Sequence, residues 1–180
     1  MVDCGVPYKR LEKELKRVKI LLITHTHGDH LNVKTYETIK RRHPHIVTLG
    51  NYDVAYHVNL DKIVANSPIT AKGYEIYSFD LFHDVPCTGF AWEWEGKNVI
   101  YATDTWSLEN APDWKYDYFF IESNHDERKV AMIDDSKYGY KAKEGSLRHL
   151  STQKAREFYF VNRRDRWAEF VELHKSERFY

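Results

Sequence analysis

The sequence predicts a layered α/β domain with a mixed sheet. Three observations carry this prediction: short continuous apolar runs typical of buried strands, segments in which apolar and polar residues alternate, and stretches of helical spacing between them. Hairpin-like and crossover-like connections both occur, which favours a sheet that is neither all parallel nor all antiparallel. A chain of 180 residues without repeats or a Pro/Gly/Ser linker is expected to form one domain, residues 1–180.

The first part of the chain predicts helices that alternate with buried strands. Leu11, Leu15 and Val18 recur at helical spacing, whereas the run from Ile20 to Ile23 is continuously apolar. Asn32 is a residue type that caps helices, and His43-Pro44 is expected to end that helix. The predicted elements are a helix from Tyr8 to Val18, a strand at 20–23, a helix from Asn32 to about Arg42 and a strand from Ile46 to Leu49.

The rest of the chain predicts a hairpin followed by strands and one clear helix. Alternation is strongest at Phe90, Trp92 and Trp94, and Glu95-Gly96-Lys97-Asn98 is expected to turn this strand into the next one. Ser151 is expected to cap the helix. The predicted elements are strands at 77–83, 90–94, 99–101 and 118–121, a helix from Ser151 to about Asn162, and a last strand from Phe170 to Leu173.

The charge of the chain is balanced overall but uneven along its length. Lys plus Arg and Asp plus Glu each number 27, which disfavours a strongly basic coat for nucleic acid. Residues 137–166 nevertheless hold nine basic and three acidic residues, whereas residues 103–135 hold nine acidic and three basic ones. The basic segment is suited to a phosphate and the acidic one to cations, although both are also what two solvated faces would show.

Two cysteines, Cys4 and Cys87, form no motif with each other, so a reduced cytoplasmic protein is expected. No run approaches the roughly 20 apolar residues that a membrane span needs, and the N-terminus has no apolar signal core. We therefore expect no membrane partner.

The strongest chemical signal is the run Thr24-His25-Thr26-His27-Gly28-Asp29-His30, directly after a predicted strand. In an extended segment residues i and i+2 point the same way, so His25 and His27 can hold one metal ion. Gly28 is expected to let the chain turn sharply, which would aim Asp29 and His30 at a second ion. Imidazole and carboxylate ligands suit Zn²⁺, with Mn²⁺ or Fe²⁺ as alternatives.

Two ions need further ligands, and three candidates lie where predicted elements end or begin. These candidates are His83, Asp104 and His149. Each is unremarkable alone, because a lone histidine is more often a surface or core residue and a lone aspartate after a strand is usually a turn or cap. They become candidate metal ligands only because the cluster from His25 to His30 has too few ligands for two ions.

The run from Thr24 to His30, followed by these three residues in order, resembles the metallo-β-lactamase superfamily. The closer resemblance is to its YycJ (WalJ) branch, described as DNA exonucleases, and spans nearly the whole chain. The stretches that carry it are Val2 to Gly5, His83-Asp84 running to Gly89-Phe90, Ala102 to Asp104, Glu122 to Asp126, and His149 to Ser151. The resemblance implies an αββα sandwich. Here it would be shortened at the N-terminus, because the family has strands before Asp3-Cys4-Gly5.

The resemblance also implies a role for each ligand. His25, His27 and His83 would hold the first ion, Asp29, His30 and His149 the second, and Asp104 would bridge both. Lactamases with two zinc ions commonly carry cysteine at position 104, whereas phosphodiesterase branches carry aspartate. A hard oxygen ligand fits phosphoryl chemistry. The expected function is therefore a phosphodiesterase that acts on DNA ends or on small, for instance cyclic, nucleotides.

Other residues of the resembling stretches are candidates for contact with substrate. Asp29 would orient the attacking water or accept its proton, and His125 would donate to a phosphate oxygen or a leaving group. Asn124 and Arg148 are candidate substrate-binding residues, and Arg148 replaces a glycine usual in the branch. His174 resembles a late histidine of the same branch and is not assigned.

Two alternative functions stay open at this point. The same metals would serve a thioester or lactone hydrolase, and a shortened domain would serve as an inactive metal-binding interaction module. A missing first part of the sheet would also leave an exposed edge, which a second subunit could pair to form a homodimer.

Overall fold

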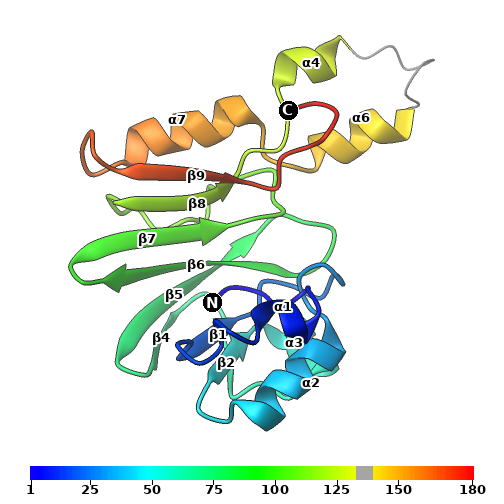
Figure 1. Ribbon diagram of the computed structural model, residues 1–180. Helices are drawn as coiled ribbons and strands as arrows, with labels where there is room; N and C mark the ends of the chain where they lie inside the picture. The colour runs from blue at the N-terminus through cyan, green and yellow to red at the C-terminus, as the bar shows by residue number, and fades with distance from the viewer. Residues whose placement is uncertain (133–139) are drawn as a thin grey trace.

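The computed structural model describes residues 1–132 and 140–180, and its strands form two sheets (Figure 1). The smaller sheet has the order β1-β2-β3 and the larger one the order β4-β5-β6-β7-β8-β9. The strands are β1 (Ile20–Leu22), β2 (Val47–Gly50), β3 (Lys62–Ile63), β4 (Pro68–Ala71), β5 (Tyr74–Leu81), β6 (Cys87–Trp94), β7 (Lys97–Ala102), β8 (Tyr118–Glu122) and β9 (Glu169–Leu173). The helices are α1 (Tyr8–Leu11), α2 (Val33–Arg42), α3 (Tyr52–His57), α4 (Glu127–Ala131), α6 (Tyr140–Leu147) and α7 (Thr152–Asn162).

The larger sheet is mixed, as the sequence predicts. Strands β4 to β7 are joined as antiparallel neighbours, and the β6–β7 hairpin turns at Glu95-Gly96, both with positive φ. Strands β7, β8 and β9 then run parallel, so the chain must cross over between them. Their arrowheads point to the same end of the sheet in Figure 1. That end is where the polar candidates lie.

Buried apolar residues form three clusters, and each cluster lies between two layers. One lies between the small sheet and the helices that cover it, one between the two sheets, and one between the large sheet and α7. Examples are Leu21 with Ile39 in the first, Leu22 with Phe90 in the second, and Phe119 with Ala155 in the third. The predicted α/β sandwich, with its helix–sheet–sheet–helix order, is confirmed.

Helix starts agree with the sequence better than helix lengths do. The side chain of Asn32 accepts from the backbone N–H of Thr35, and that of Ser151 accepts from Lys154 N–H, so both predicted caps are confirmed. The helix expected from Tyr8 to Val18 is wrong in length, because α1 ends at Leu11 and the chain goes on in turns. Those turns still bury Leu15 completely, which explains why the spacing looked helical. Among the described residues, no helix combines the length and the apolarity needed to cross a bilayer.

Several short elements were not predicted, chiefly α3, β3 and β4. They fall between residues 52 and 71, where β3 has two residues and α3 has six. Such elements are too short to show a period in the sequence and depend on tertiary pairing, as β3 does on β2.

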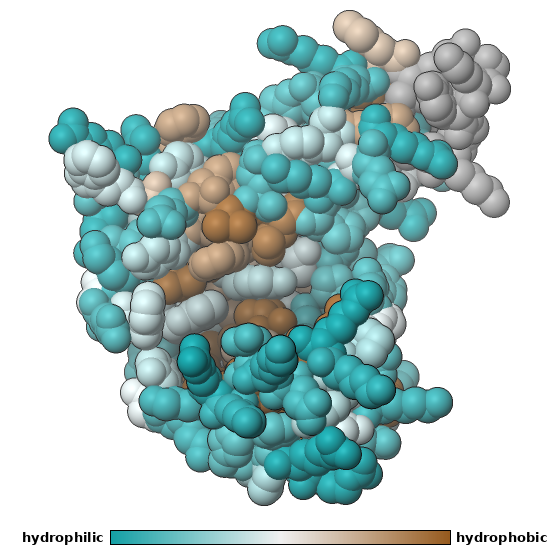
Figure 2. All heavy atoms as spheres, viewed as in Figure 1, coloured by the Kyte–Doolittle hydropathy of each residue, from teal (hydrophilic) through white to brown (hydrophobic). Residues whose placement is uncertain are grey.

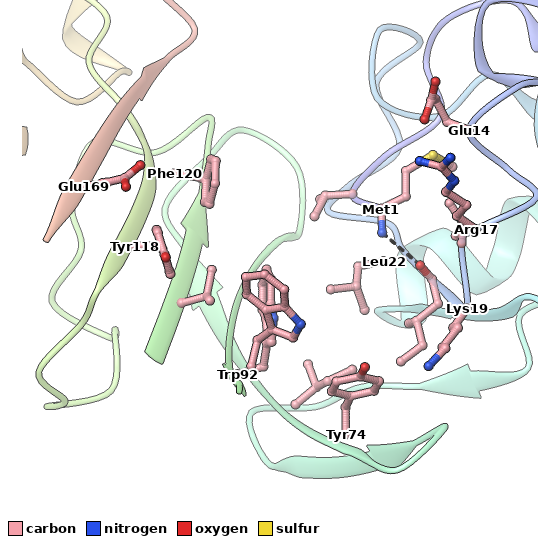
Figure 3. A pocket seen from close by; sticks show the side chains of 16 residues that line it. Met1, Glu14, Arg17, Lys19, Leu22, Tyr74, Trp92, Tyr118, Phe120 and Glu169 are labelled. Atoms are coloured by element: carbon pink, nitrogen blue, oxygen red, sulfur yellow. Dashed lines mark hydrogen bonds between the residues drawn. The ribbon is translucent and has the colours of Figure 1, made fainter. Parts of the chain in front are cut away.

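The small sheet covers only part of the inner face of the large sheet. The remainder borders an apolar cavity of about 800 Å³ between Ile20 and Leu22 on one wall and Trp92, Tyr118 and Phe120 on the other (Figure 3). Figure 2 shows brown, apolar atoms gathered in this hollow at the centre of the view. None of the candidate metal ligands lines it. The cavity is therefore separate from the polar end of the sheets.

Candidate metal centre

The candidate ligands meet because five strands end at the same place. Strands β1, β5, β7, β8 and β9 end just before or at the polar residues, which are His25, His83, Asp104, Glu122 and His174. In an α/β sheet the carboxyl ends of parallel strands form one edge, and ligands bind there. The topology thus collects residues that are up to about 150 positions apart in the chain.

A first group consists of three imidazoles, His25, His27 and His83. His27 Nδ1 lies 3.1 Å from His25 Nε2 and 3.3 Å from His83 Nε2. Neutral imidazole carries a proton on only one nitrogen, so three ring nitrogens converging at this range cannot all be satisfied by donating to each other. A divalent ion bound by all three nitrogens satisfies them together, and this donor set suits zinc.

A second group surrounds Asp104, which is 4% exposed. His30 Nε2 lies 3.1 Å from its Oδ2, and His174 Nε2 lies 3.3 Å from its Oδ1. His149 Nδ1 is more distant, at 3.9 Å from Oδ1. Asp104 can share an ion with His25 and His30, and another with His149, His174 and Glu122. Its carboxylate therefore stands between the parts of the cluster, where a bridging ligand belongs.

Buried carboxylates hold the histidine rings from behind. His30 Nδ1 donates to Asp3 Oδ2 at 2.7 Å, which leaves Nε2 to face Asp104. The Oε1 atom of Glu122 accepts from His149 Nδ1 at 2.6 Å and from His174 Nδ1 at 2.9 Å. Metal-bound histidines in proteins are oriented in this manner, since the carboxylate fixes the tautomer and the ring plane. The arrangement fits a metal site better than a network of surface histidines.

The electrostatics of the cluster also fit divalent ions. Burial lowers the pKa of His25 to about 3, so this ring is neutral at physiological pH, as a metal-binding imidazole must be. Burial acts in the same direction on His30, but its contacts with Asp104 and Asp3 outweigh it and raise the pKa to about 10. Asp104 is buried, yet the hydrogen bond from His30 and the nearby His174 keep its pKa well below the usual range. Without an ion, a proton on His30 partly takes the place of the cation.

Three residues of the centre have left-handed backbone conformations. The φ angles are 57° at Asp3, 54° at Asp104 and 52° at His174. Non-glycine residues adopt this region rarely, and they cluster at functional sites where the surrounding structure holds them. Each of the three follows a strand or an edge segment and turns its side chain into the cluster.

The histidine loop is packed against the N-terminal segment at Gly5. A Cβ atom on Gly5 would lie 1.7 Å from the carbonyl oxygen of Asp29, so no other residue fits without moving the loop. The chain turns at Gly28, as expected, but this turn does not depend on a glycine. Its φ is not positive, and a Cβ atom there would meet nothing within 4 Å. The turn after His27 instead forms through backbone bonds from His30 and Leu31 to the His27 carbonyl.

The remaining candidates lie around this centre in different environments. The Asp29 side chain is 73% exposed, and its Oδ2 lies 3.7 Å from His30 Nε2. Asn124 is 6% exposed and donates through Nδ2 to the His174 carbonyl at 2.8 Å. His125 is 3% exposed, and its Nδ1 has no hydrogen-bond partner among the described residues. Arg148 is an exposed residue beside His149. The structure thus brings the seven candidate ligands together but buries Asn124 and His125 behind them.

Three residues of the cluster were not assigned from the sequence. The sequence pattern places Glu122 and Asp3 only within the resembling stretches and gives His174 no role. A signal was present for each, since Asp3 and Glu122 flank predicted strands and His174 follows the last one. Their contacts are 20 to 50 positions away in the chain, so no local pattern reveals them.

The sequence is similar to two curated proteins that are both named ribonuclease Z. The sequence matches ribonuclease Z of Methanococcus maripaludis strain C6 with 25% identity over 165 residues, covering 75% of this chain and 53% of the relative. The ribonuclease Z of strain C7 matches with 26% identity, covering 75% of this chain and 52% of the relative. The chain thus spans about half the length of the curated relatives it matches. No family model matches the sequence.

Several solved structures superpose on nearly the whole of this chain. The metallo-β-lactamase-fold protein YhfI of Bacillus subtilis superposes with a TM-score of 0.65 and 18% identity, over 98% of this chain and 73% of that one. The short form of human tRNase Z gives a TM-score of 0.62 and 19% identity, over 98% and 82%. A diphosphatase of the PhnP family gives a TM-score of 0.67 and 13% identity, over 99% and 68%. The chain therefore has the metallo-β-lactamase fold.

Proposed function

We propose that this protein is a dinuclear metal-dependent phosphodiesterase that acts on nucleic acid. The observation that carries the proposal is the position of Asp104, a buried carboxylate that faces histidines on both sides. The relatives and neighbours support the reaction class, because ribonuclease Z, tRNase Z and a diphosphatase are all named for cleaving bonds to phosphorus. We place RNA first among the substrates, with DNA ends and small nucleotides as the alternatives that the sequence favoured.

The ligand assignment that fits the distances changes one residue of the set expected from the sequence. His25, His27 and His83 would hold the first ion, Asp29 and His30 would belong to the second, and Asp104 would be shared by both. His174 would complete the second ion's ligands, because Glu122 holds its Nδ1 and leaves its Nε2, 3.3 Å from Asp104 Oδ1, to face the ion. His149, held by the same Glu122 carboxylate and 20% exposed, faces the substrate phosphate.

When bound, two zinc ions would lower the pKa of water and stabilise the charge that develops on the phosphate. The exposed Asp29 carboxylate orients the attacking water and accepts its proton. His149 donates to a phosphate oxygen, and Arg148, exposed next to it, offers a guanidinium for a second oxygen. His125 is buried, so a direct donation from its side chain to the substrate is not part of this proposal.

Two further features bear on the cellular location and the oligomeric state of the proposed enzyme. Cys4 and Cys87 are both free and buried, which suits the reducing cytoplasm. The N-terminal segment pairs with the edge strand β1 through Asp3 N–H to the Leu22 carbonyl at 2.8 Å. Met1 and Val2 of this segment also line the apolar cavity of Figure 3, and a homodimer would form through this edge.

The first test is hydrolysis of bis-p-nitrophenyl phosphate with Zn²⁺ or Mn²⁺. We expect metal-dependent turnover that Asp104→Ala and His27→Ala abolish and that His45→Ala, an exposed histidine outside the centre, leaves intact. Folded protein that holds two ions and turns over neither this substrate nor RNA would contradict the proposal. Turnover of thioesters or lactones instead would assign the metals to that chemistry.

A second experiment separates the roles of the two late histidines. His174→Ala is expected to bind one ion fewer, whereas His149→Ala keeps two ions and loses turnover. Metal content measured by mass spectrometry of the elements, together with initial rates, distinguishes the variants. The opposite pattern would return His149 to the ligand set and remove His174 from it.

A further inference from the structure

The end of α7 and the loop after it place two large aromatic side chains in solvent. Trp167 is 75% exposed and Phe160 is 59% exposed. Each ring lies under a guanidinium: Arg166 is 4.6 Å from the centre of Trp167, and Arg163 is 4.9 Å from the centre of Phe160. Exposed aromatics that alternate with arginines in this way differ from a plain charged face, since each pair offers a flat apolar surface beside a cation.

The loop that carries these side chains is held in place. Arg164 Nε donates to Asp117 Oδ2 at 3.0 Å, and the Arg164 backbone N–H donates to the Tyr116 carbonyl. Asp165, the one acid of the loop, accepts from the Trp167 backbone N–H at 2.7 Å. By contrast, Arg163 and Arg166 take part in none of the ion pairs found between residues that the structure describes. Their charges remain available to a ligand.

We propose that Phe160, Arg163, Arg166 and Trp167, the aromatic–arginine platform, bind a single-stranded part of the nucleic-acid substrate. This inference rests on the proposed function. Nucleic acid is the class that uses both features, because bases stack on aromatic rings and guanidinium planes while phosphates pair with the arginine charges. An acidic protein partner would use the charges but would leave two rings in water.

The position of the platform sets a length for the strand it binds. Strands β8 and β9 run in register from Tyr118 and Glu169, beside the platform, to Glu122 and Leu173, at the metal centre. Five residues of strand span roughly 17 Å. A stacked strand advances about 3.4 Å per nucleotide, so about five nucleotides are needed to reach from the centre to the platform. A shorter substrate occupies the centre alone.

The test measures binding of phosphorothioate-linked oligonucleotides, which resist cleavage, to the zinc-loaded full chain by fluorescence anisotropy. Trp167→Ala is expected to weaken binding of a 12-mer about ten-fold and to leave binding of a 3-mer unchanged. Trp167→Phe retains most of the affinity. The matched control is Trp94→Ala, an exposed tryptophan that none of the described arginines covers, and its 12-mer affinity stays at the level of the unaltered protein.

Salt dependence identifies the contribution of the arginines. Replacing Arg163 and Arg166 together by Gln is expected to reduce the slope of log affinity against log salt by about 1 to 2, whereas Trp167→Ala leaves the slope unchanged. Equal 12-mer affinity for Trp167→Ala and Trp94→Ala would overturn the platform. Turnover of bis-p-nitrophenyl phosphate is expected to be the same in all these variants and in the unaltered protein. If none of them turns over this substrate, the proposed function fails, while the binding result for the platform is unaffected.

Discussion

At the scale of single residues, the Glu122 carboxylate fixes two histidine rings at once. It is completely buried, and besides the two rings it accepts from the Thr105 backbone N–H at 2.8 Å. Glu122→Gln keeps the shape but turns one acceptor oxygen into a donor, so it conflicts with at least one of these bonds. We expect zinc affinity to fall 10- to 100-fold, which is typical when the group that accepts the other ring N–H of a metal-bound histidine is replaced. Chelator competition measures it, with the exposed Glu12→Gln as control, and unchanged affinity would contradict this role.

Asp117 gives a prediction about pH that is independent of the metals. It accepts from the Asn98 backbone N–H at 2.8 Å, from Lys97 and from Arg164. Burial raises the pKa of a carboxyl, but these three donors outweigh it and lower the pKa of Asp117. A depressed folded-state pKa means that the stabilisation is present above the unfolded pKa, near 3.9, and is lost as the pH falls further.

Asp117→Asn should therefore lower the free energy of unfolding at pH 7 by about 1–2 kcal/mol. The difference from the unaltered protein should close as the pH falls below roughly 4. Urea unfolding of zinc-free protein at several pH values measures this, with Asp113→Asn, an exposed neighbour, as the control. A difference in unfolding free energy that stays constant down to pH 3 would show that the charge of Asp117 does not stabilise the folded state.

At the scale of elements, the histidine loop depends on its contact with the N-terminal segment. Gly5→Ala would put a Cβ atom 1.7 Å from the Asp29 carbonyl oxygen and displace the loop, whereas Gly28→Ala has open space. We expect Gly5→Ala to lose binding of the second ion and at least about 2 kcal/mol of stability, within the range of overpacking effects. Gly28→Ala should bind both ions. Zinc titration by calorimetry compares the two, and similar behaviour of both variants would refute this account.

At the scale of the whole molecule, the proposed ions would join the two sheets, in addition to hydrogen bonds such as that from the Thr88 backbone N–H to the Thr24 carbonyl and that from Asn51 Nδ2 to Thr88 Oγ1. In the proposed assignment, one ion would be held by residues of the loops after β1 and β5 and the other by residues of the loops after β1, β7 and β9, so both would fasten the two sheets to each other. An ion present at 100 times its dissociation constant stabilises the folded state by about 2.7 kcal/mol. Removing zinc with a chelator should lower the unfolding temperature by roughly 5–10 °C per ion. Differential scanning calorimetry measures this shift in unfolding temperature. In His25→Ala, the part of the shift that the first ion contributes should be lost.

Much of the fold was readable from the sequence where elements are long or capped. Asn32 and Ser151 marked the starts of α2 and α7, because a cap is a local bond between a side chain and the next turn. Alternation marked the end of β6, because Phe90 and Trp92 lie between the sheets whereas Glu93 is exposed. The short elements α3, β3 and β4 were missed because a two- or four-residue strand is stabilised by its neighbour rather than by its own pattern.

The sequence by itself determined the chemistry of the centre: four potential ligands in the run from His25 to His30, and an aspartate rather than a cysteine at position 104. The tertiary structure decided which further side chains lie against these residues, namely His174, held by Glu122, and Asp3 behind His30. It also decided that Gly5, and not Gly28, is the glycine on which the loop depends. The physical reason is the same in each case. Residue type and local spacing are written in the chain, whereas a hydrogen bond or a steric contact between strand ends exists only once the two sheets have packed.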